Sequence, residues 1–338
     1  MVKQAVANTE GGPGGDWREV YESRLTTHEE AVRVVKSGDT VVFSIFASRD
    51  LQSALFARGH ELNNVTVRLI APSFDPGWLR PGSEDAFSIE FELFIGDFAR
   101  FVSDERRAAY LPNLFSLGMK AYDEARPDVK APEVAMVVVS PPNKQGYCHF
   151  GAHHWVQRSY ARRVQAVIAE VDPSLIKVYG DCYIHVSEID HFVEAKPVTF
   201  TKEQFDEILK DVGAERRQAW ERIWNVLPDP TRLAPLASII AAMSPEDVLR
   251  FLGLMPPPEY ARTVAGYLSE LIQDGDTIQI GVGEPARFIP NLGAFDDRED
   301  LGLHTELGSP ELGRLVQEGV ITGRYKEIHR EKAVATAR

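Results

Sequence analysis

The feature that most constrains this chain is a pattern of helix, turn and strand that occurs twice. Residues 29–44 (EEAVRVVKSGDTVVFS) place apolar residues at helical spacing, continue through Gly-Asp-Thr and end in a short apolar run. Residues 263–283 (TVAGYLSELIQDGDTIQIGVG) repeat that order. A glycine, Gly38 or Gly275, stands at the end of each predicted helix, where glycine readily adopts the positive φ required there. The apolar run that follows is typical of a buried strand.

A second strand-like run follows each copy at a similar distance, at residues 65–73 (VTVRLIAPS) and 300–309 (DLGLHTELGS). The order of elements is therefore the same in both parts of the chain. Alternating strands and helices favour a parallel sheet covered by helices. The sequence predicts an α/β protein with two homologous α/β domains whose sheets are largely parallel.

The first domain is predicted over residues 17–196. Near-continuous apolar runs such as 134–139 (VAMVVV) indicate strands that are buried on both faces. The predicted strands are 40–47, 65–72, 91–96, 134–142 and 166–172, and the predicted helices between them are 52–62 and the less regular 106–126.

The rest of the chain is predicted to hold a tail, a helical segment and a shorter second domain. Residues 1–16 are polar and Gly-rich without an apolar core, which predicts a disordered tail and not a secretory signal. Residues 197–258 combine helical spacing with Pro-rich breakers and are interpreted as a helical linker or insertion. Residues 259–338 begin the second domain. That domain is predicted to be incomplete. The first domain forms its strands over a long stretch after Gly38, and far fewer residues follow Gly275.

Composition excludes several classes of protein. A net charge of −13 argues against broad nucleic-acid binding, which needs a basic surface. The sequence contains no apolar run long enough to cross a membrane. The two cysteines, Cys148 and Cys182, are too few for a disulfide scaffold, so we expect free thiols and a cytoplasmic location.

A rigid loop is predicted where the strand at 134–142 ends. The sequence runs through Ser140-Pro141-Pro142, turns and passes Gly146 before aromatic residues resume. The prolines fix φ at the carboxyl end of a strand, which is the end at which open α/β sheets bind ligands. A plain turn with a rigid entry is the alternative.

A glycine turn follows the strand of the second copy. Gly281 and Gly283 leave room for backbone N–H groups to approach an anion or a developing oxyanion. The turn lacks the third glycine of a dinucleotide-binding fingerprint. A tight turn between strand and helix, without a ligand, is the alternative interpretation.

A carboxylate stands at the end of the next strand. The strand predicted at 301–307 places Glu306 at the point where the strand becomes a loop. The residues that follow, Ser309-Pro310-Glu311, are those expected at the start of a helix. A carboxylate at the carboxyl end of a strand, beside a glycine turn on the neighbouring strand, is well placed to act as a nucleophile. Taken alone, Glu306 would be an ordinary loop acid.

Other candidate sites are weaker. The histidines at 149, 153 and 154 lack a Cys or carboxylate at metal-ligand spacing, which argues against a zinc site. Cys148 as a thiolate nucleophile is disfavoured. The Asp190-His191 pair has no accompanying Gly-x-Ser-x-Gly elbow, so a serine-hydrolase triad is not expected.

Taken together and in this order, these segments resemble the acetyl-CoA hydrolase/transferase family, which includes 4-hydroxybutyrate, butyrate:acetate and succinate:acetate CoA-transferases. The resemblance spans most of residues 21–336 apart from 197–258. The matching stretches are 29–43, 139–151, 166–172, 180–194, 271–285, 300–323 and 332–336.

The resemblance implies roles for individual residues. The catalytic glutamate of the family lies in a His-Thr-Glu stretch, which is residues 304–306 here and makes Glu306 the nucleophile. The CoA-binding turn of the family corresponds to Gly281, Val282 and Gly283 and continues through Glu284 and Pro285. The loop with Ser140, Pro141, Pro142 and Gly146 resembles a wall of the substrate pocket. The chain differs from the family at residues 44–52, where a Gly-rich turn is usual, and at Glu284, where a small residue is usual.

The implied activity is ping-pong transfer of CoA between carboxylic acids, through a glutamyl-CoA thioester on Glu306. Acyl-CoA and a small carboxylic acid are then the substrates, and neither a metal nor a tightly bound cofactor is required. Interception by water would make the same site an acyl-CoA hydrolase. A non-catalytic subunit or fragment, completed by a second chain, is a further alternative. By resemblance, a homo-oligomer is expected.

Overall fold

The structure is a computed structural model that describes residues 16–337, except 44–46, 71, 73, 93–95, 115–116, 154, 197–199, 211, most of 228–255, 282 and 284. The chain divides into two compact units, Met1–Val248 and Leu249–Arg338. The predicted tail at 1–16 lies almost wholly outside the described residues. In this division, the helices described at 202–208 and 214–226 belong with the first unit, and the predicted limits of the 197–258 segment stay a prediction.

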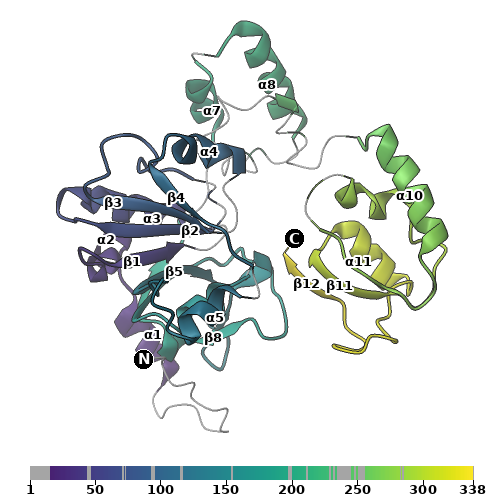
Figure 1. The fold of residues 1–338 in the computed structure, drawn as a ribbon, viewed down its shortest axis with the longest axis horizontal. Helices are drawn as coiled ribbons and strands as arrows, with labels where there is room; N and C mark the ends of the chain where they lie inside the picture. Colours follow the sequence, from purple (N-terminus) through teal and green to yellow (C-terminus); the bar gives the residue numbers. More distant parts are fainter. Residues whose placement is uncertain are drawn as a thin grey trace. The chain divides into compact units, whose positions relative to one another are not determined.

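The first unit is built on a seven-stranded sheet in which all the pairings are parallel (Figure 1). In spatial order its strands are β4 (Ala108–Leu111), β3 (Phe87–Glu92), β2 (Val65–Ile70), β1 (Thr40–Phe43), β5 (Val134–Val139), β7 (Ala166–Val171) and β9 (His191–Glu194). A short antiparallel pair, β6 (Tyr147–His149) and β8 (Tyr183–His185), lies beside it.

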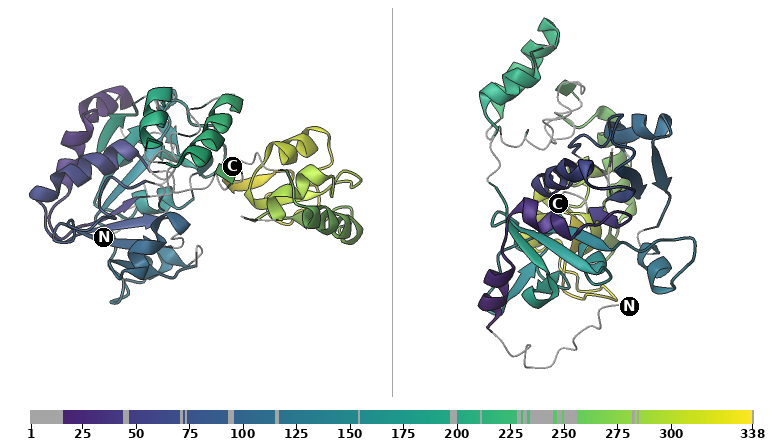
Figure 2. Two further views of the ribbon diagram at one scale, coloured as in Figure 1. Left: turned by 90° about the horizontal axis from the view of Figure 1, so that it is seen from above. Right: turned by 90° about the vertical axis from the view of Figure 1, so that its left-hand side faces the viewer.

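Helices cover both faces of this sheet (Figures 1 and 2). They are α1 (Trp17–Arg24), α2 (His28–Ala31), α3 (Arg49–Ala57), α4 (Gly96–Asp104), α5 (Gly118–Asp123) and α6 (Gln157–Ala161), followed along the chain by α7 (Lys202–Ile208) and α8 (Ala214–Val226).

Alternation along the strands divides the core into two layers. On β5, Met136 packs into the layer shared with α2 and α3, while Ala135 and Val137 pack into the layer shared with α6. The same alternation holds on β7, where Ile168 faces the first layer and Val167 the second. Apolar residues on both faces explain why these strands read as continuous apolar runs.

The second unit has a smaller parallel sheet in the order β10 (Thr277–Ile278), β11 (Gly302–Leu307) and β12 (Val334–Ala337). Helix α10 (Glu259–Leu271) and helix α11 (Pro310–Gln317) flank it, and side chains of both helices pack with Ile278 and Leu303 in one core. The predicted fold class, α/β with parallel sheets in both parts, is confirmed.

The repeated pattern is also a repeat of hydrogen bonds. Gly38 and Gly275 have φ values of +85° and +81°. The carboxylate of Asp39 accepts from Lys36 N at 2.8 Å, and that of Asp276 accepts from Gln273 N at 2.8 Å. The backbone carbonyls of the two aspartates then accept at 2.8 Å from the next strand, β2 in one unit and β11 in the other. The two joints are therefore built in the same way.

Two predicted elements were wrong. The strand predicted at 91–96 lies at Phe87–Glu92, and α4 begins at Gly96. Apolar residues alternate with polar ones along β3, whereas the prediction followed the continuous apolar run that comes later. The helix predicted at 106–126 contains the edge strand β4 and the short helix α5. An edge strand with little buried surface carries only a weak apolar pattern.

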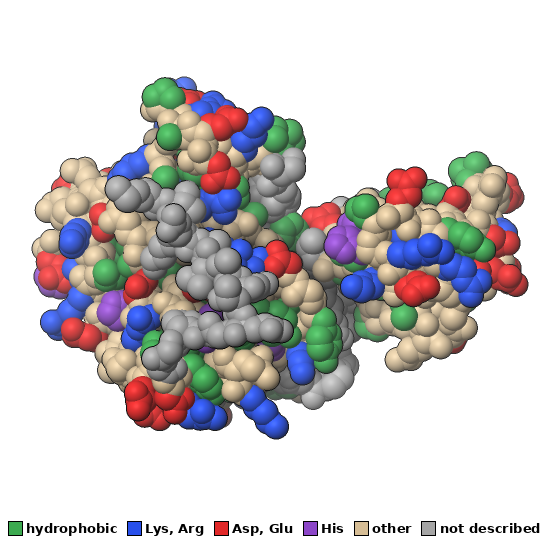
Figure 3. Space-filling view, turned by 90° about the horizontal axis from the view of Figure 1, so that it is seen from below, with side chains coloured by type: hydrophobic (Ala, Val, Ile, Leu, Met, Phe, Trp, Pro, Cys, Tyr) green, Lys and Arg blue, Asp and Glu red, His purple; other side chains and the backbone are tan. Residues whose placement is uncertain are grey.

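No helix among the described residues is long and apolar enough to cross a membrane. On the face shown in Figure 3, acidic and basic side chains are interspersed, so on that face the negative net charge is not gathered in one patch.

The close packing at Gly302 gives a prediction. A Cβ at this position would lie 2.4 Å from Thr277 Oγ1 and 2.7 Å from Lys326 Cγ. Gly302→Ala should therefore destabilise the second unit by ~1–3 kcal/mol. Hydrogen exchange of β11 peptides in increasing urea measures this. Gly313→Ala is the matched control, because it meets nothing within 4 Å on α11. An equal loss of stability in both variants would contradict the packing argument.

Candidate active site around Glu306

Glu306 is the penultimate residue of β11, and its side chain is partly buried. The chain after β10 runs alongside this end of β11, since Leu307 N donates to Ile280 O at 3.2 Å. Both segments run in the same direction, so the carboxyl end of β11 lies beside the glycine turn. Glu306 and the glycine turn are therefore neighbours within one unit, and their catalytic role stays a prediction.

Thr305 fixes the register of this end of the strand. Its hydroxyl oxygen accepts from Ile280 N at 2.8 Å. The hydroxyl also donates to a backbone carbonyl, and the two carbonyl oxygens within reach are those of Ile280 at 3.0 Å and Leu307 at 3.2 Å. The side chain is only 3% exposed. Because neighbouring strand residues point to opposite faces, locking Thr305 on one face places Glu306 on the other.

Gly281 leaves space for the carboxylate. A Cβ on Gly281 would lie 3.9 Å from Glu306 Oε2, in ordinary van der Waals contact, so this glycine lies directly beside the carboxylate. Gly283 is exposed and has a φ of +111°, and its carbonyl accepts from Arg287 N at 3.1 Å. Val282 and Glu284, which were also predicted to contact CoA, lie outside the described residues.

The chain then leaves both strands through short helical turns. Pro285 precedes a 3₁₀ turn at Ala286–Phe288. After β11, Ser309 caps α11 by accepting from Leu312 N at 3.2 Å, Pro310 is the first helical residue and Glu311 lies in the first turn. This start of α11 is confirmed as predicted.

A buried lysine lies behind β11. Lys326 is 5% exposed, and its ammonium donates to Leu303 O and Lys332 O, each at 2.8 Å. Burial lowers its pKa from the ordinary value of 10.5. This contact could not be predicted, because no local pattern around Lys326 marks it as buried.

The loop with the paired prolines lies in the first unit. Ser140 is buried and closes the loop, since its N donates to His149 O at 2.8 Å and its hydroxyl accepts from His149 N at 3.0 Å. Gly146 has a φ of +80°, and a Cβ there would lie 2.8 Å from the Trp17 side chain. Ser140 and Pro141 line a cavity of about 280 Å³. Pro142, which is partly buried, follows them in the loop.

Cys148, two residues beyond Gly146, is not set up as a nucleophile. Its thiol is fully buried, and burial raises its pKa to about 12. Both cysteines are free thiols.

A second cavity, which the sequence did not indicate, has a volume of about 750 Å³ and lies in the first unit over β2 and β3. Its charged and polar groups already bond one another. Arg68 donates to Glu90 and to the Tyr122 hydroxyl, and Glu92 accepts from Asn113 at 2.8 Å. Strand alternation places Arg68, Glu90 and Glu92 on one face of the sheet. The sequence would have indicated this group of charged residues if β3 had been predicted at its true position.

Comparison with known proteins decides the family. The acetyl-CoA hydrolase/transferase N-terminal domain matches residues 13–201, which is more than half of the chain. The chain belongs to the acetyl-CoA hydrolase/transferase family. The family predicted from the sequence is therefore confirmed.

The curated relatives are longer proteins. The chain is 27% identical to a 4-hydroxybutyrate coenzyme A transferase of Clostridium kluyveri, over 95% of this chain and 62% of the relative. It is 27% identical to a succinyl-CoA:cyclohexane-1-carboxylate CoA transferase of Geobacter metallireducens, over 94% of this chain and 60% of the relative. The chain thus spans about three fifths of the length of these relatives.

Solved structures agree on the fold. RipA from Yersinia pestis is similar with a TM-score of 0.67 and 22% identity, over 96% of this chain and 65% of that one. A 4-hydroxybutyrate CoA-transferase from Porphyromonas gingivalis gives a TM-score of 0.59 and 22% identity, over 95% of this chain and 64% of that one.

The surroundings of His304 give a prediction about pH. Burial, then the nearby charges of Lys326 and His329, lower the pKa of His304 below its ordinary 6.5. The imidazolium is disfavoured by both effects, so His304 should titrate below pH 6.5 in a proton NMR titration. His329→Asn should raise the midpoint, because it removes one repelling cation from a ring whose centre is 5.8 Å away.

Arg330→Gln is the control for the His304 titration. Arg330 is also an exposed cation of this segment, and at ordinary salt concentrations its charge should be screened from His304. A His304 midpoint at or above 6.5 in the unmodified chain would contradict the assignment. An equal upward shift in both variants would show that general charge, and not the ring contact, sets the pKa.

Proposed function

We propose that this chain carries the nucleophile of an acyl-CoA:carboxylate CoA-transferase, and that Glu306 forms a covalent glutamyl-CoA thioester. The observation that carries the proposal is the placement of the Glu306 carboxylate beside Gly281, at the carboxyl ends of neighbouring parallel segments. Membership of the acetyl-CoA hydrolase/transferase family supports it, as do the relatives named as CoA-transferases.

The proposed first half-reaction uses two displacements. A carboxylate oxygen of Glu306 attacks the thioester carbonyl carbon of an acyl-CoA, giving a mixed anhydride and releasing CoA as its thiolate. The thiolate then attacks the glutamyl carbonyl carbon. The acyl group leaves as a carboxylate, and CoA remains on Glu306 as a thioester.

The second half-reaction runs the same steps in reverse with a new acid. A second carboxylate attacks the glutamyl thioester and releases the CoA thiolate. The thiolate attacks the acyl carbonyl of the new anhydride, which forms the new acyl-CoA and restores the Glu306 carboxylate. Both intermediates stay activated, so no external energy source is needed.

The glycine turn has a proposed part in this reaction. Each attack creates a negative charge on a carbonyl oxygen, and backbone N–H groups of the turn at Gly281 and Gly283 are proposed to stabilise it. Removing one such donor in an enzyme typically costs ~10²–10³ in rate. Val282, Glu284 and Pro285 are proposed to complete the CoA contact, and Ser140, Pro141, Pro142 and Gly146 to form a wall of the acid pocket.

Hydrolysis of acyl-CoA is the second candidate, and the partial exposure of Glu306 favours it. Water that reaches the glutamyl thioester would release CoA without an acceptor acid. The two activities are separated by offering an acyl-CoA with and without a panel of small carboxylates. A new acyl-CoA indicates transfer, whereas free CoA that forms regardless of the acceptor indicates hydrolysis.

Glu306→Gln should abolish transfer, by at least ~10³-fold, because an amide cannot attack the thioester. Intact-protein mass spectrometry of the unmodified chain with acyl-CoA should show a CoA-sized adduct on the peptide carrying Glu306. The adduct should be cleaved by hydroxylamine, as expected for a thioester. Glu311→Gln is the matched control, since Glu311 bonds Arg314 on α11 and should leave transfer unchanged.

Two outcomes would count against the nucleophile assignment: normal transfer by Glu306→Gln, or an adduct on another peptide. We also propose a homo-oligomer, with a second chain as an alternative way to complete the site. Mass measurement of the native protein tests both. Transfer that appears only when a co-purifying polypeptide is added would favour the subunit interpretation.

A further inference from the structure

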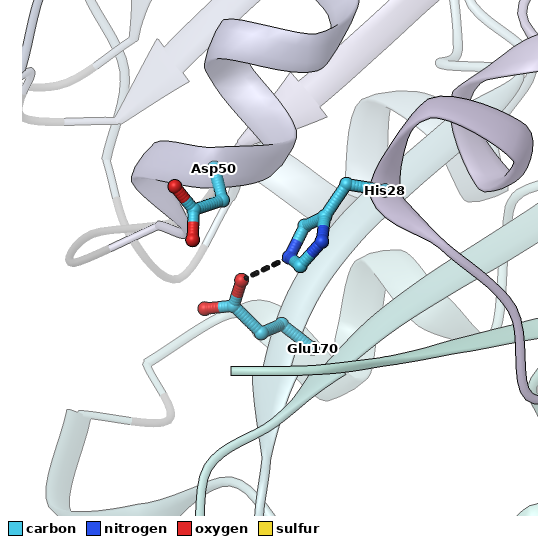
Figure 4. A group of neighbouring side chains, drawn as sticks. All are labelled: His28, Asp50 and Glu170. Carbon is cyan, nitrogen blue, oxygen red and sulfur yellow. Dashed lines mark hydrogen bonds and ion pairs between the residues drawn. The ribbon is translucent and has the colours of Figure 1, made fainter. Parts of the chain in front are cut away.

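Three ionisable side chains converge in the first unit at a place that no sequence motif marks. His28 is the first residue of α2, Asp50 lies in the first turn of α3, and Glu170 is the penultimate residue of β7. Figure 4 shows the His28 ring and the two carboxylates turned toward one another. One ligand atom from each residue lies within 4.8 Å of a ligand atom of the other two residues. Among the described residues, these three form the one group of His, Cys, Asp and Glu side chains that meets this distance.

The contacts within the group centre on one oxygen. His28 Nε2 lies 3.0 Å from Glu170 Oε2, and the Ser48 hydroxyl donates to the same oxygen. Ser48 also caps α3, since its oxygen accepts from Leu51 N at 3.0 Å. The exposed fractions of His28, Ser48 and Glu170 are 5%, 5% and 8%. The site is therefore walled by residues of three separate elements.

Two carboxylates share this site, and one of them is buried. Asp50 is paired with the exposed Lys196 at 4.0 Å, and Glu170 is contacted by His28 and Ser48. Buried carboxylates are costly unless they are paired or bind a metal. Asp50 is half-buried, so it gives a cation a way in from solvent.

The donor atoms select the class of cation. One imidazole nitrogen with two carboxylate oxygens suits Zn²⁺ or Mn²⁺, whereas Mg²⁺ and Ca²⁺ prefer oxygen alone. Ligand bonds of about 2.0–2.2 Å place ligand atoms ~3–3.5 Å apart around a metal ion. The 3.0 Å between His28 and Glu170 matches that spacing, and a carboxylate oxygen of Asp50 lies within 4.8 Å of both ligand atoms.

We propose that His28, Asp50 and Glu170 bind one divalent transition-metal ion of the Zn²⁺ or Mn²⁺ class. The ion ties α2 and the start of α3 to the end of β7. This place is at the carboxyl ends of the parallel strands, where open sheets bind ligands. The site is in the first unit, and the chemistry proposed for Glu306 uses none of its three residues, so either proposal can fail without the other.

Metal binding is tested on the whole chain after removal of metal with a chelator. Equilibrium dialysis against Zn²⁺ or Mn²⁺, with elemental analysis of the protein, should show one equivalent bound and much weaker binding of Mg²⁺. Asp50→Asn should weaken binding at least about tenfold, because it removes a charged ligand. This variant keeps the buried bonds that join His28, Ser48 and Glu170, so the fold should be unchanged in the absence of metal.

Two further variants complete the design. His28→Gln removes the nitrogen ligand and should weaken binding by at least the same factor. His60→Gln is the matched control, because His60 is an exposed histidine of the same unit whose ring bonds Ala57 O, outside the group. Binding should be unchanged in this control.

Thermal unfolding gives a second readout. A ligand that binds only the folded state raises the unfolding midpoint, so Zn²⁺ or Mn²⁺ should raise that of the unmodified chain and not that of Asp50→Asn. The proposal is overturned if the unmodified chain binds no stoichiometric metal, or if Asp50→Asn and His28→Gln bind it as well as the unmodified chain does. The three residues would then form only a hydrogen-bonded link between α2, α3 and β7.

Discussion

One buried hydroxyl group helps to fix the position of Glu306. Thr305 joins β11 to the segment that follows β10, through its bond from Ile280 N and its donation to a neighbouring carbonyl. A parallel pair has no hairpin to set its register, so side chains and backbone bonds must set it. A slip of one residue would turn Glu306 into the core and Thr305 toward the glycine turn. The proposed chemistry therefore relies on a buried residue that has no part in the proposed bond-making steps.

A single residue also has several structural roles where each unit starts its sheet. An aspartate after a glycine holds the preceding turn with its side chain and offers its carbonyl to the next strand. One residue thus ends a helix, begins a strand and positions the neighbouring strand. The conformational freedom of Gly38 and Gly275 is needed because the chain reverses at a positive φ. This explains why the same three-residue pattern marks both units.

Much of the fold could be predicted because parallel strands are apolar on both faces. β1, β2, β5 and β7 were recognised from that signal, while β3 and β4 were misplaced because polar residues on one face or an exposed edge weaken it. The proximity of Glu306 to Gly281 was predictable for another reason. Parallel strands bring their carboxyl ends to one edge, so Glu306 and Gly281 had to lie close if 277–283 and 301–307 were neighbours.

By itself, the sequence determined the two α/β units, their family and the pairing of Glu306 with the glycine turn, because each of these follows from local patterns repeated in order. Only the tertiary structure decided which distant polar residues meet. His28 and Glu170 are 142 residues apart and bond in the interior, and Lys326 lies buried behind β11. A buried polar contact is specified by the packing of whole elements and leaves no periodic trace in the chain. For that reason the proposed metal site was invisible in the sequence, whereas the proposed nucleophile was not.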